Sequence, residues 1–140
     1  MKHIVVGTDA TPRGREAVLV ASELAMATGA NLHVVSCTDS RKTTSMNVGS
    51  DSFHDDPVAL AQQVLASITG TLPNDQITTA VSSDTPAKAL CEEAERLDAD
   101  MIVVGNKRVQ GAARVLGSIA NDVMKQAPCH VLVADTGALD

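Results

Sequence analysis

Short, largely apolar runs recur along this chain, and segments with helical periodicity separate them. The runs lie at residues 3–6, 32–37, 77–81, 101–104 and 130–134. Runs of this kind are typical of strands in a sheet that helices cover on both faces, since alternation would leave one face polar. The sequence therefore predicts an α/β domain of order β-α-β-α-β-α-β-α-β, with an open parallel five-stranded sheet in three layers.

Helix boundaries are marked by capping residues, prolines and glycines. Thr11-Pro12, Asp56-Pro57 and Thr85-Pro86 each place a capping residue before proline, which indicates a helix start. Gly29 and Gly70 occupy the positions expected of C-terminal cap glycines. Residues 39–54, which are polar and contain glycine, predict a loop, and the short, threonine-rich run at 77–81 predicts an edge strand.

The segment from Gly105 to Ser118, GNKRVQGAARVLGS, joins the fourth predicted strand to the last helix. It contains three glycines and three cations, and no acidic residue lies between Asp100 and Asp122, although the formal net charge is −6. Helix N-termini offer unpaired N–H groups and a positive dipole, and glycine permits close approach. The segment therefore suits a phosphate-bearing ligand, with a basic surface loop containing turn glycines as the alternative.

A second part of the candidate site follows the first strand. Ligands of such sheets bind beyond the carboxyl ends of the strands, where the strand order reverses. With the order 3-2-1-4-5, Gly7-Thr8-Asp9 would face Gly105 across one crevice. Asp9 could accept from a ribose hydroxyl or an amine, or help to hold a metal, or be a turn or cap residue. Cys37, at the end of the second strand, could offer backbone groups to a base edge or simply fill a small buried space.

The last helix is expected to begin at Gly117-Ser118. Ser118 could bind phosphate through its hydroxyl and N–H groups, and it could also serve as the helix N-cap. The helical pattern beyond it consists of Ile119, Val123, Met124 and Ala127.

Composition excludes several classes of protein. The net charge of −6, the absence of Trp and Tyr, and the single Phe argue against nucleic-acid binding. No apolar run approaches the roughly 18 residues of a membrane span, and no signal-peptide pattern opens the chain. We therefore expect one domain over residues 1–140, located in the cytoplasm. Cys37, Cys91 and Cys129 lack metal-type spacing and are expected to be reduced.

Catalytic and metal-binding motifs are missing from the sequence. The glycine segment is neither GxGxxG nor a Walker loop, which requires Lys-Ser/Thr directly after its last glycine. His54-Asp55-Asp56 is interpreted as a helix cap rather than as a set of metal ligands. No nucleophile and base form a recognisable arrangement, so we predict no catalytic residues, and weak ATPase activity stays open as an alternative.

The chain resembles the universal stress proteins over essentially its whole length. The resemblance rests on IVVGTD at residues 4–9, ADMIVVG at 99–105, LGS at 116–118 and APCHVLV at 127–133, in this order and at these distances. It implies the strand order 3-2-1-4-5 assumed above. It also implies a homodimer that pairs through the last strand, His130–Ala134.

The resemblance further implies a ligand, which is ATP or a related adenine nucleotide such as AMP or cyclic AMP, with Mg²⁺ as an optional companion. In ATP-binding members the loop reads G-x2-G-x9-G-S/T. Gly105 matches its first glycine and Gly117-Ser118 its last pair, but Arg108 replaces the second glycine and the loop is one residue shorter. Arginine there could block the triphosphate or supply a cation to it.

By the same resemblance, Asp9 contacts the nucleoside and the backbone at Cys37 meets the adenine. The candidate ligand-binding residues are Gly7, Thr8, Asp9, Cys37, Gly105, Asn106, Lys107, Arg108, Gly117, Ser118 and Ile119. The alternative function is a dimeric stress or signalling protein that binds no nucleotide and acts through protein partners.

Overall fold

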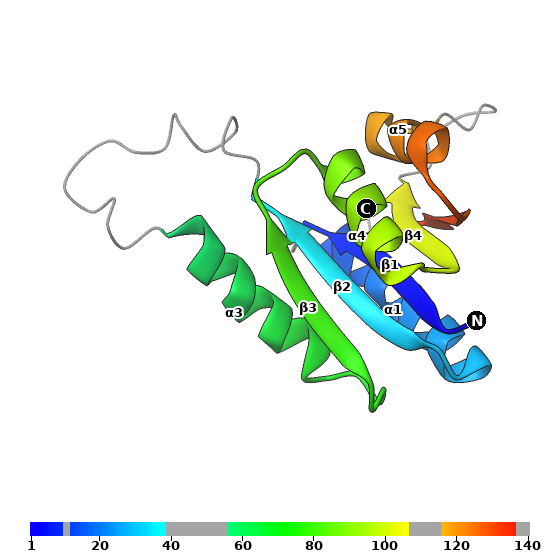
Figure 1. Cartoon of the computed structure of the whole chain (residues 1–140). Coiled ribbons are helices and arrows are strands. Elements are labelled where there is room, and N and C mark those ends of the chain that lie inside the picture. The colour runs from blue at the N-terminus through cyan, green and yellow to red at the C-terminus, as the bar shows by residue number, and fades with distance from the viewer. Residues whose placement is uncertain (10–11, 39–55, 107–115, 137–140) are drawn as a thin grey trace, which may run out of the picture.

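The computed structural model describes residues 1–9, 12–38, 56–106 and 116–136 (Figure 1). The strands are β1 (His3–Thr8), β2 (Asn31–Cys37), β3 (Ile77–Ser82), β4 (Met101–Asn106) and β5 (His130–Asp135). The helices are α1 (Pro12–Thr28), α3 (Pro57–Thr69), α4 (Pro86–Leu97) and α5 (Ser118–Gln126). The predicted helix cap at Thr11 and the predicted loop over residues 39–54 lie outside the described residues.

The five strands form one parallel sheet in the order β3-β2-β1-β4-β5, as predicted. β3 is an edge strand, which confirms the prediction from its threonine-rich sequence, and β5 forms the opposite edge. β1 and β4 each continue two residues beyond the predicted apolar run, because their ladders with β2 and β5 continue there. Thr8 is paired with Ser36, and Asn106 with Asp135.

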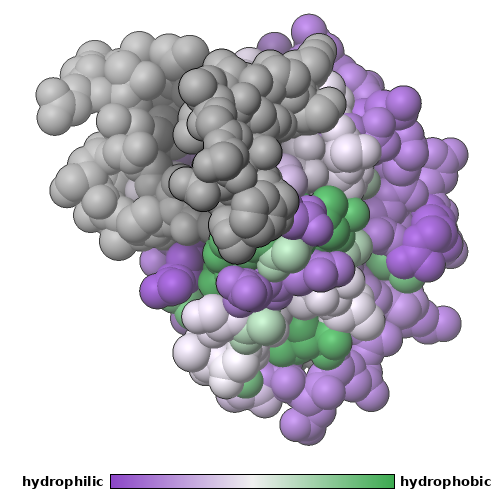
Figure 2. Space-filling model, turned by 90° about the vertical axis from the view of Figure 1, so that its left-hand side faces the viewer, coloured by the Kyte–Doolittle hydropathy of each residue, from purple (hydrophilic) through white to green (hydrophobic). Residues whose placement is uncertain are grey.

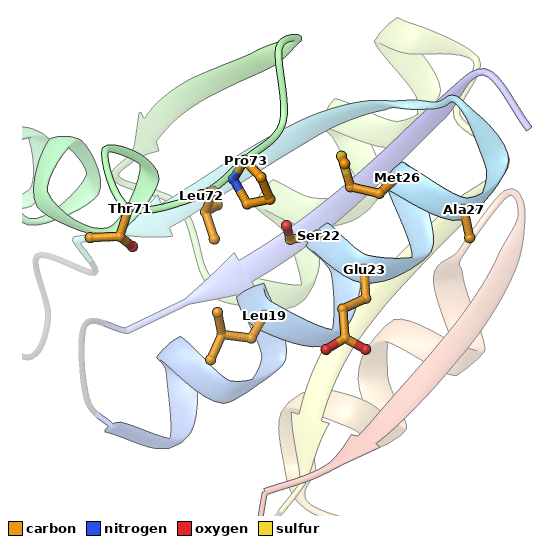
Figure 3. A pocket seen from close by; sticks show the side chains of 8 residues that line it. All are labelled: Leu19, Ser22, Glu23, Met26, Ala27, Thr71, Leu72 and Pro73. Atoms are coloured by element: carbon orange, nitrogen blue, oxygen red, sulfur yellow. The ribbon is translucent and has the colours of Figure 1, made fainter.

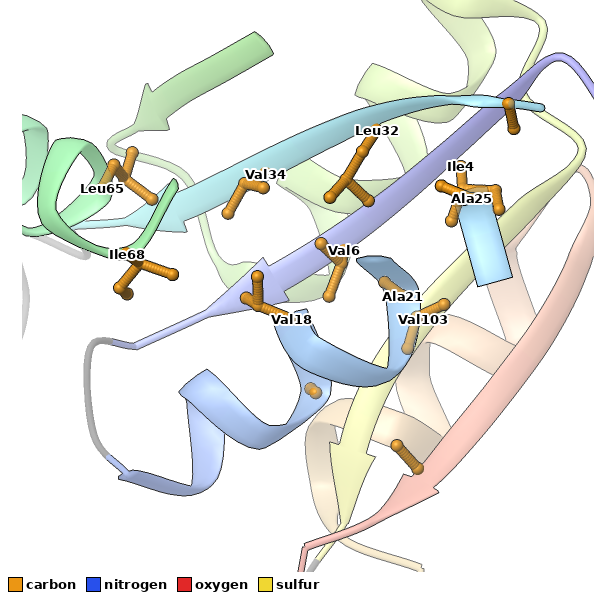
Figure 4. Close-up of a cluster of buried hydrophobic side chains, with 13 residues drawn as sticks. Ile4, Val6, Val18, Ala21, Ala25, Leu32, Val34, Leu65, Ile68 and Val103 are labelled. Atoms are coloured by element: carbon orange, nitrogen blue, oxygen red, sulfur yellow. The ribbon is translucent and has the colours of Figure 1, made fainter. Parts of the chain in front are cut away.

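Helices cover both faces of the sheet (Figure 1). Ile4 and Val6 of β1 pack with buried residues of α1 and α3, which form the cluster drawn in Figure 4. Val5, between them, packs on the other face with buried residues of α4 and α5. Successive side chains of a strand point to opposite faces, so β1 is apolar at all three positions because it contributes to both halves of the core.

The helix ends agree with most of the predicted caps. Asp56 accepts a hydrogen bond from the Val58 N–H at 3.0 Å, whereas Thr85 lies at the N-cap position of α4 without a side-chain hydrogen bond. Gly29 has φ +74°, the left-handed conformation that glycine adopts without strain. Gly70 ends α3 but stays right-handed, with φ −63°.

One prediction about α5 is wrong. Gly117 is the N-cap and Ser118 is already the first helical residue, so Ser118 is not the cap. In addition, the buried residues of α5 are Ala120 and Val123. Ile119 and Met124 are 42% and 52% exposed, because the helix turns its small residues toward α4 and the sheet. The apolar pattern expected from the sequence therefore contains both buried and exposed residues.

The surface carries scattered hydrophobic side chains. Figure 2 shows hydrophobic residues reaching the surface between polar ones on the side of the molecule where α3 lies. The exposed large residues of α3 are Val58 and Leu60. Within the described ranges, none of the helices has the length and the hydrophobicity that crossing a membrane would require.

Candidate functional site

The pairing of β1 with β4 ends early, and the region between the two strand ends is called the crevice below. β1 pairs with β2 as far as Thr8 and Ser36, but its ladder with β4 runs only from Ile4–Met101 to Val6–Val103. Beyond that point residues 7–9 lie on one side and residues 104–106 on the other. The order of the strands reverses here, with β2 and β3 on one side of β1, and β4 and β5 on the other. This is the position at which open parallel sheets bind ligands.

The β1 side of the crevice is packed tightly against the first turn of α1. A Cβ built on Gly14 would lie 2.6 Å from Oδ1 of Asp9 and 2.7 Å from Oγ1 of Thr8. It would also lie 2.9 Å from the backbone nitrogen of Asp9. Only glycine therefore fits at position 14 while Asp9 and Thr8 keep these positions.

Gly14 is a site-shaping residue that the sequence analysis missed. The sequence did contain a signal for it, since a glycine inside a helix is less stable than alanine and usually has a packing or functional role. The reason here is the close approach of the end of β1.

Gly7 has a packing role. A Cβ at this position would lie 2.9 Å from Cδ1 of Leu90 and 3.2 Å from its Cδ2, so the glycine lets α4 approach β1. Here the glycine allows the close approach of a core side chain, that of Leu90. Thr8, the next residue, is buried, with 8% of its surface exposed.

On the other side of the crevice, Asn106 joins three elements. Its Oδ1 accepts a hydrogen bond from the Gly117 N–H at 2.6 Å, and its carbonyl oxygen accepts from the Thr136 N–H at 3.1 Å. Asn106 thus ties the end of β4 to the start of α5 and to the residue that follows β5. One of the amides predicted to bind an anion, that of Gly117, is therefore used within the protein.

The next amides of α5 are in a different situation. Gly117 has extended backbone angles, φ −67° and ψ 164°, and as a glycine it has no side chain with which to cap the helix. Ser118 and Ile119, the first two helical residues, are exposed. N–H groups at these positions have no acceptor within an α-helix, so they suit an anionic group and are favoured by the helix dipole.

Cys37 lies at the end of β2, beside the end of β1. It is partly buried and is paired with Ser82 of β3. The N–H of the following residue, Thr38, donates to the Ser82 carbonyl at 2.7 Å, so this amide is engaged by β3.

None of the three cysteines, all of which lie in the described part of the chain, forms a disulfide. Burial raises the pKa of Cys91 and of Cys129, with a smaller contribution from nearby acidic groups. Both thiols are therefore protonated at neutral pH.

Two further features lie away from the crevice. The structure has a shallow cavity of about 560 Å³, lined by α1 and by the turn after α3 (Figure 3). Its walls include Leu19, Met26 and Pro73, and none of the predicted ligand-binding residues. Over the described ranges, no group of three or more His, Cys, Asp or Glu side chains could hold a metal ion.

The structure thus brings most of the predicted residues to one end of the sheet. Gly7 and Thr8 end β1 and Asp9 follows it, while Gly105 and Asn106 end β4 beside Gly117. Lys107 and Arg108 lie outside the described residues.

The chain matches a known protein family and several of its members. The model of the Universal stress protein family matches residues 1–135. Universal stress protein A homolog 1 of Coxiella burnetii (strain RSA 493 / Nine Mile phase I) is 28% identical over 138 residues, which cover 94% of both chains. Among solved structures, a universal stress protein in complex with cAMP is 26% identical, with a TM-score of 0.70 and coverage of 96% of this chain and 97% of that one. Universal stress protein UspA from Lactobacillus plantarum, 23% identical over 95% of this chain and 97% of its own, has the same fold, with a TM-score of 0.70.

Proposed function

This chain belongs to the universal stress protein family, whose model matches residues 1–135, and from that premise we propose that it is a homodimeric, cytoplasmic regulatory module that binds an adenine nucleotide. The crevice between β1 and β4 is the proposed binding site. The observation that carries the proposal is the N-terminus of α5 beside this crevice, where the N-cap residue is a glycine without a capping side chain. A similar protein, 26% identical over 96% of this chain, has been solved in complex with cAMP.

The proposed roles follow from the chemistry of each position. The amides of Ser118 and Ile119, at the start of α5, bind the phosphate, and Gly105 lets the backbone of β4 approach it. Asp9, which is exposed at the end of β1, accepts from a ribose hydroxyl. The backbone near Cys37 meets the adenine edge. Lys107 and Arg108 supply cations to the phosphates, and Mg²⁺ would accompany a triphosphate.

Equilibrium dialysis with ATP, AMP and cyclic AMP tests this function. We expect saturable binding of at least one of them below the millimolar range. Adenosine is the matched control, because it lacks the phosphate that α5 would bind and should bind more weakly. If none of the three nucleotides binds below the millimolar range, the proposal fails.

Gly117→Leu tests the placement of the site. A Cβ at position 117 already lies 3.1 Å from Oδ1 of Asn106, and a leucine side chain at this exposed position extends into the phosphate approach. We expect nucleotide binding to be lost while the thermal unfolding transition is retained. Retained affinity in a folded variant contradicts the placement at α5.

Arg108→Gly restores the glycine of the family loop and decides what this arginine does. A gain in ATP affinity would mean that Arg108 obstructs the triphosphate. A loss would mean that it binds the phosphates.

The proposed homodimer forms through β5. This strand is at the edge of the sheet, and Val131, Leu132 and Val133 are only partly buried in a single chain. An apolar edge strand with unpaired backbone groups favours pairing with a second copy. Sedimentation equilibrium at micromolar concentration should therefore give the mass of a dimer, and the melting temperature should rise with protein concentration. A monomer mass at this concentration contradicts the proposed dimer.

A second candidate function is a dimeric signalling protein that acts through protein partners without a nucleotide. The hydrogen bond between Asn106 and Gly117 favours it, because that bond occupies an amide that an anion would otherwise use. Mass spectrometry of denatured, freshly purified protein separates the two candidates. Co-purified adenine nucleotide at a stoichiometric level would exclude the partner-only function.

A further inference from the structure

A row of three hydrogen-bonded side chains crosses the sheet beneath α4, far from the candidate site. His33 of β2 lies in the middle, with 7% of its surface exposed. Its Nε2 is 3.1 Å from Nδ1 of His3 on β1, and its Nδ1 is hydrogen-bonded to Oγ1 of Thr78 on β3. In the ladders His33 is paired with Val5 and with Thr78, so the row joins three neighbouring strands near their amino ends.

Charged groups from two other parts of the fold surround this row. Glu93 and Arg96 of α4 form an ion pair with each other and act on His33. Asp100, just before β4, accepts from the Lys2 N–H at 2.6 Å and from the His3 N–H at 3.1 Å. Burial, chiefly, together with the charges of His3 and Arg96, lowers the pKa of His33, while Glu93 opposes the shift.

The response of the His3–His33 pair to acid depends on how many protons the two rings carry. When both rings are neutral, one ring nitrogen donates and the other accepts across the 3.1 Å contact. One added proton leaves that hydrogen bond possible, since the charged ring donates to the lone pair of the neutral one. With a proton on every nitrogen, two N–H groups face each other and two like charges lie side by side. The second proton therefore breaks the contact.

We propose that His3 and His33 form a pH-responsive latch that fastens the N-terminal end of β1 to β2 and β3, and that opens when both imidazoles become protonated. The segment it releases is held by two further backbone hydrogen bonds. These run from the Asn31 N–H to the Lys2 carbonyl at 2.8 Å and from the Asp100 N–H to the His3 carbonyl at 2.9 Å. The latch lies at the opposite end of β1 from Asp9, so it does not depend on the proposed nucleotide site.

The direction of the pH effect follows from linkage. A histidine whose pKa is lowered in the folded state binds fewer protons there than in the unfolded chain. Its contribution to stability is complete above the unfolded value of about 6.5 and is lost as the pH falls below it. The latch is therefore closed at neutral pH and opens in acid.

Hydrogen exchange measured by NMR between pH 7.5 and pH 5 tests the latch. The amides of Asn31 and Asp100 report on it directly, because their acceptors are the carbonyls of Lys2 and His3. We expect their protection factors, corrected for the intrinsic pH dependence of exchange, to fall by about tenfold or more on acidification. The Asn121 amide, which donates to the Gly117 carbonyl in α5, should change much less and serves as the internal reference.

Two variants separate the latch from a general effect of acid. His3→Asn places a neutral amide where Nδ1 stood, so it can still hydrogen-bond to His33 and should remove the fall in protection. His130→Asn, at an exposed histidine of β5, is the matched control and should keep it. Protection that is independent of pH in the unmodified protein, or that falls equally in His3→Asn, overturns the proposal.

A direct titration covers the case in which His3→Asn does not fold. In the unmodified protein, the NMR signals of the His33 ring should titrate below pH 6.5, because burial lowers the pKa of this ring. A pKa of the His33 ring that is not lowered from its ordinary value contradicts the latch.

Discussion

The backbone N–H of Gly117 donates to Oδ1 of Asn106 at 2.6 Å, so the last residue of β4 fixes the first turn of α5. Eleven positions separate the two residues in the sequence. Their hydrogen bond sets where the helix N-terminus points relative to the crevice. The position of the proposed phosphate site thus depends on one amide side chain.

Substitution of Asn106 separates this structural role from ligand binding. Asn106→Ala should lower the free energy of unfolding by about 0.5–1.5 kcal/mol, the usual contribution of one hydrogen bond. Asn106→Asp keeps an acceptor for Gly117 and should keep the stability, while its negative charge should weaken the binding of a phosphate-bearing nucleotide. Urea unfolding and calorimetric titration measure the two effects. Equal nucleotide affinity in Asn106→Asp and the unmodified protein would contradict a phosphate site beside this residue.

Gly14→Ala should destabilise the protein, although alanine normally stabilises a helix. The added Cβ would meet Asp9 and Thr8 at 2.6–2.9 Å, and one of the contacted atoms belongs to the backbone. We expect the free energy of unfolding to fall by about 1–3 kcal/mol, as is typical of overpacking. Chemical denaturation measures this change. A gain of about 0.5–1 kcal/mol, the ordinary effect of replacing a helical glycine, would show that the end of β1 can move away.

Gly7→Ala should also be destabilising, and its cost should depend on Leu90. The new methyl group would lie 2.9 Å from a terminal methyl carbon of Leu90, and the expected loss is about 1–3 kcal/mol. When Gly7→Ala is combined with Leu90→Ala, the loss should be smaller than the sum of the single effects by about 0.5–3 kcal/mol. Leu65→Ala, in the cluster on the other face, is the matched control and should combine additively with Gly7→Ala.

Asp98→Gly should stabilise the protein. Asp98 ends α4 in the left-handed conformation, with φ 51° and ψ 50°, which is unfavourable for a residue that has a Cβ. We expect a gain of about 0.5–1 kcal/mol in thermal or chemical unfolding. Asp98→Ala removes the same charge but keeps a Cβ, so it should give no gain. Equal effects of the two substitutions would assign the change to the charge instead.

Asp100 should make the stability of the fold sensitive to strong acid. Hydrogen bonds from the backbone N–H groups of Lys2 and His3 lower the pKa of this carboxyl. Stability from a carboxyl with a lowered pKa is complete above the unfolded value of about 3.9 and is lost as the pH falls through the folded value. In Asp100→Asn this part of the acid sensitivity should disappear, as measured by melting temperatures between pH 5 and pH 2. An unchanged pH profile would mean that other carboxyls dominate.

Most of the fold could be predicted because its signals are local. Five apolar runs gave the strands, and glycines and prolines gave most helix ends, since both follow from backbone preferences. The strand order required the family resemblance, because apolar runs do not show which strands are neighbours. The apolar pattern of α5 likewise did not show which of its residues would be buried. Its buried residues are small ones that fit against α4, and side-chain size matters there more than hydrophobicity.

The candidate site was less predictable, because its residues have roles that only contacts reveal. Gly7 was among the predicted ligand-binding residues, and its Cα faces Leu90, which lies 83 positions later in the chain. Gly14 attracted no attention, although it lies against Asp9. The bond from Gly117 to Asn106 likewise joins elements whose distance is set by the packing of α5. Such contacts depend on the tertiary structure, and patterns of residues along the sequence do not reveal them.

The short ladder between β1 and β4 has a mechanical consequence. Among the described residues it is the only strand pairing that links the three-stranded part of the sheet, β3-β2-β1, to the two-stranded part, β4-β5, and it ends at Val6 and Val103. A molecule that touches both Asp9 and the start of α5 would connect these two parts of the sheet beyond the end of the ladder. Its binding free energy would then resist shear between the two parts, and the filled protein would be stiffer than the empty one.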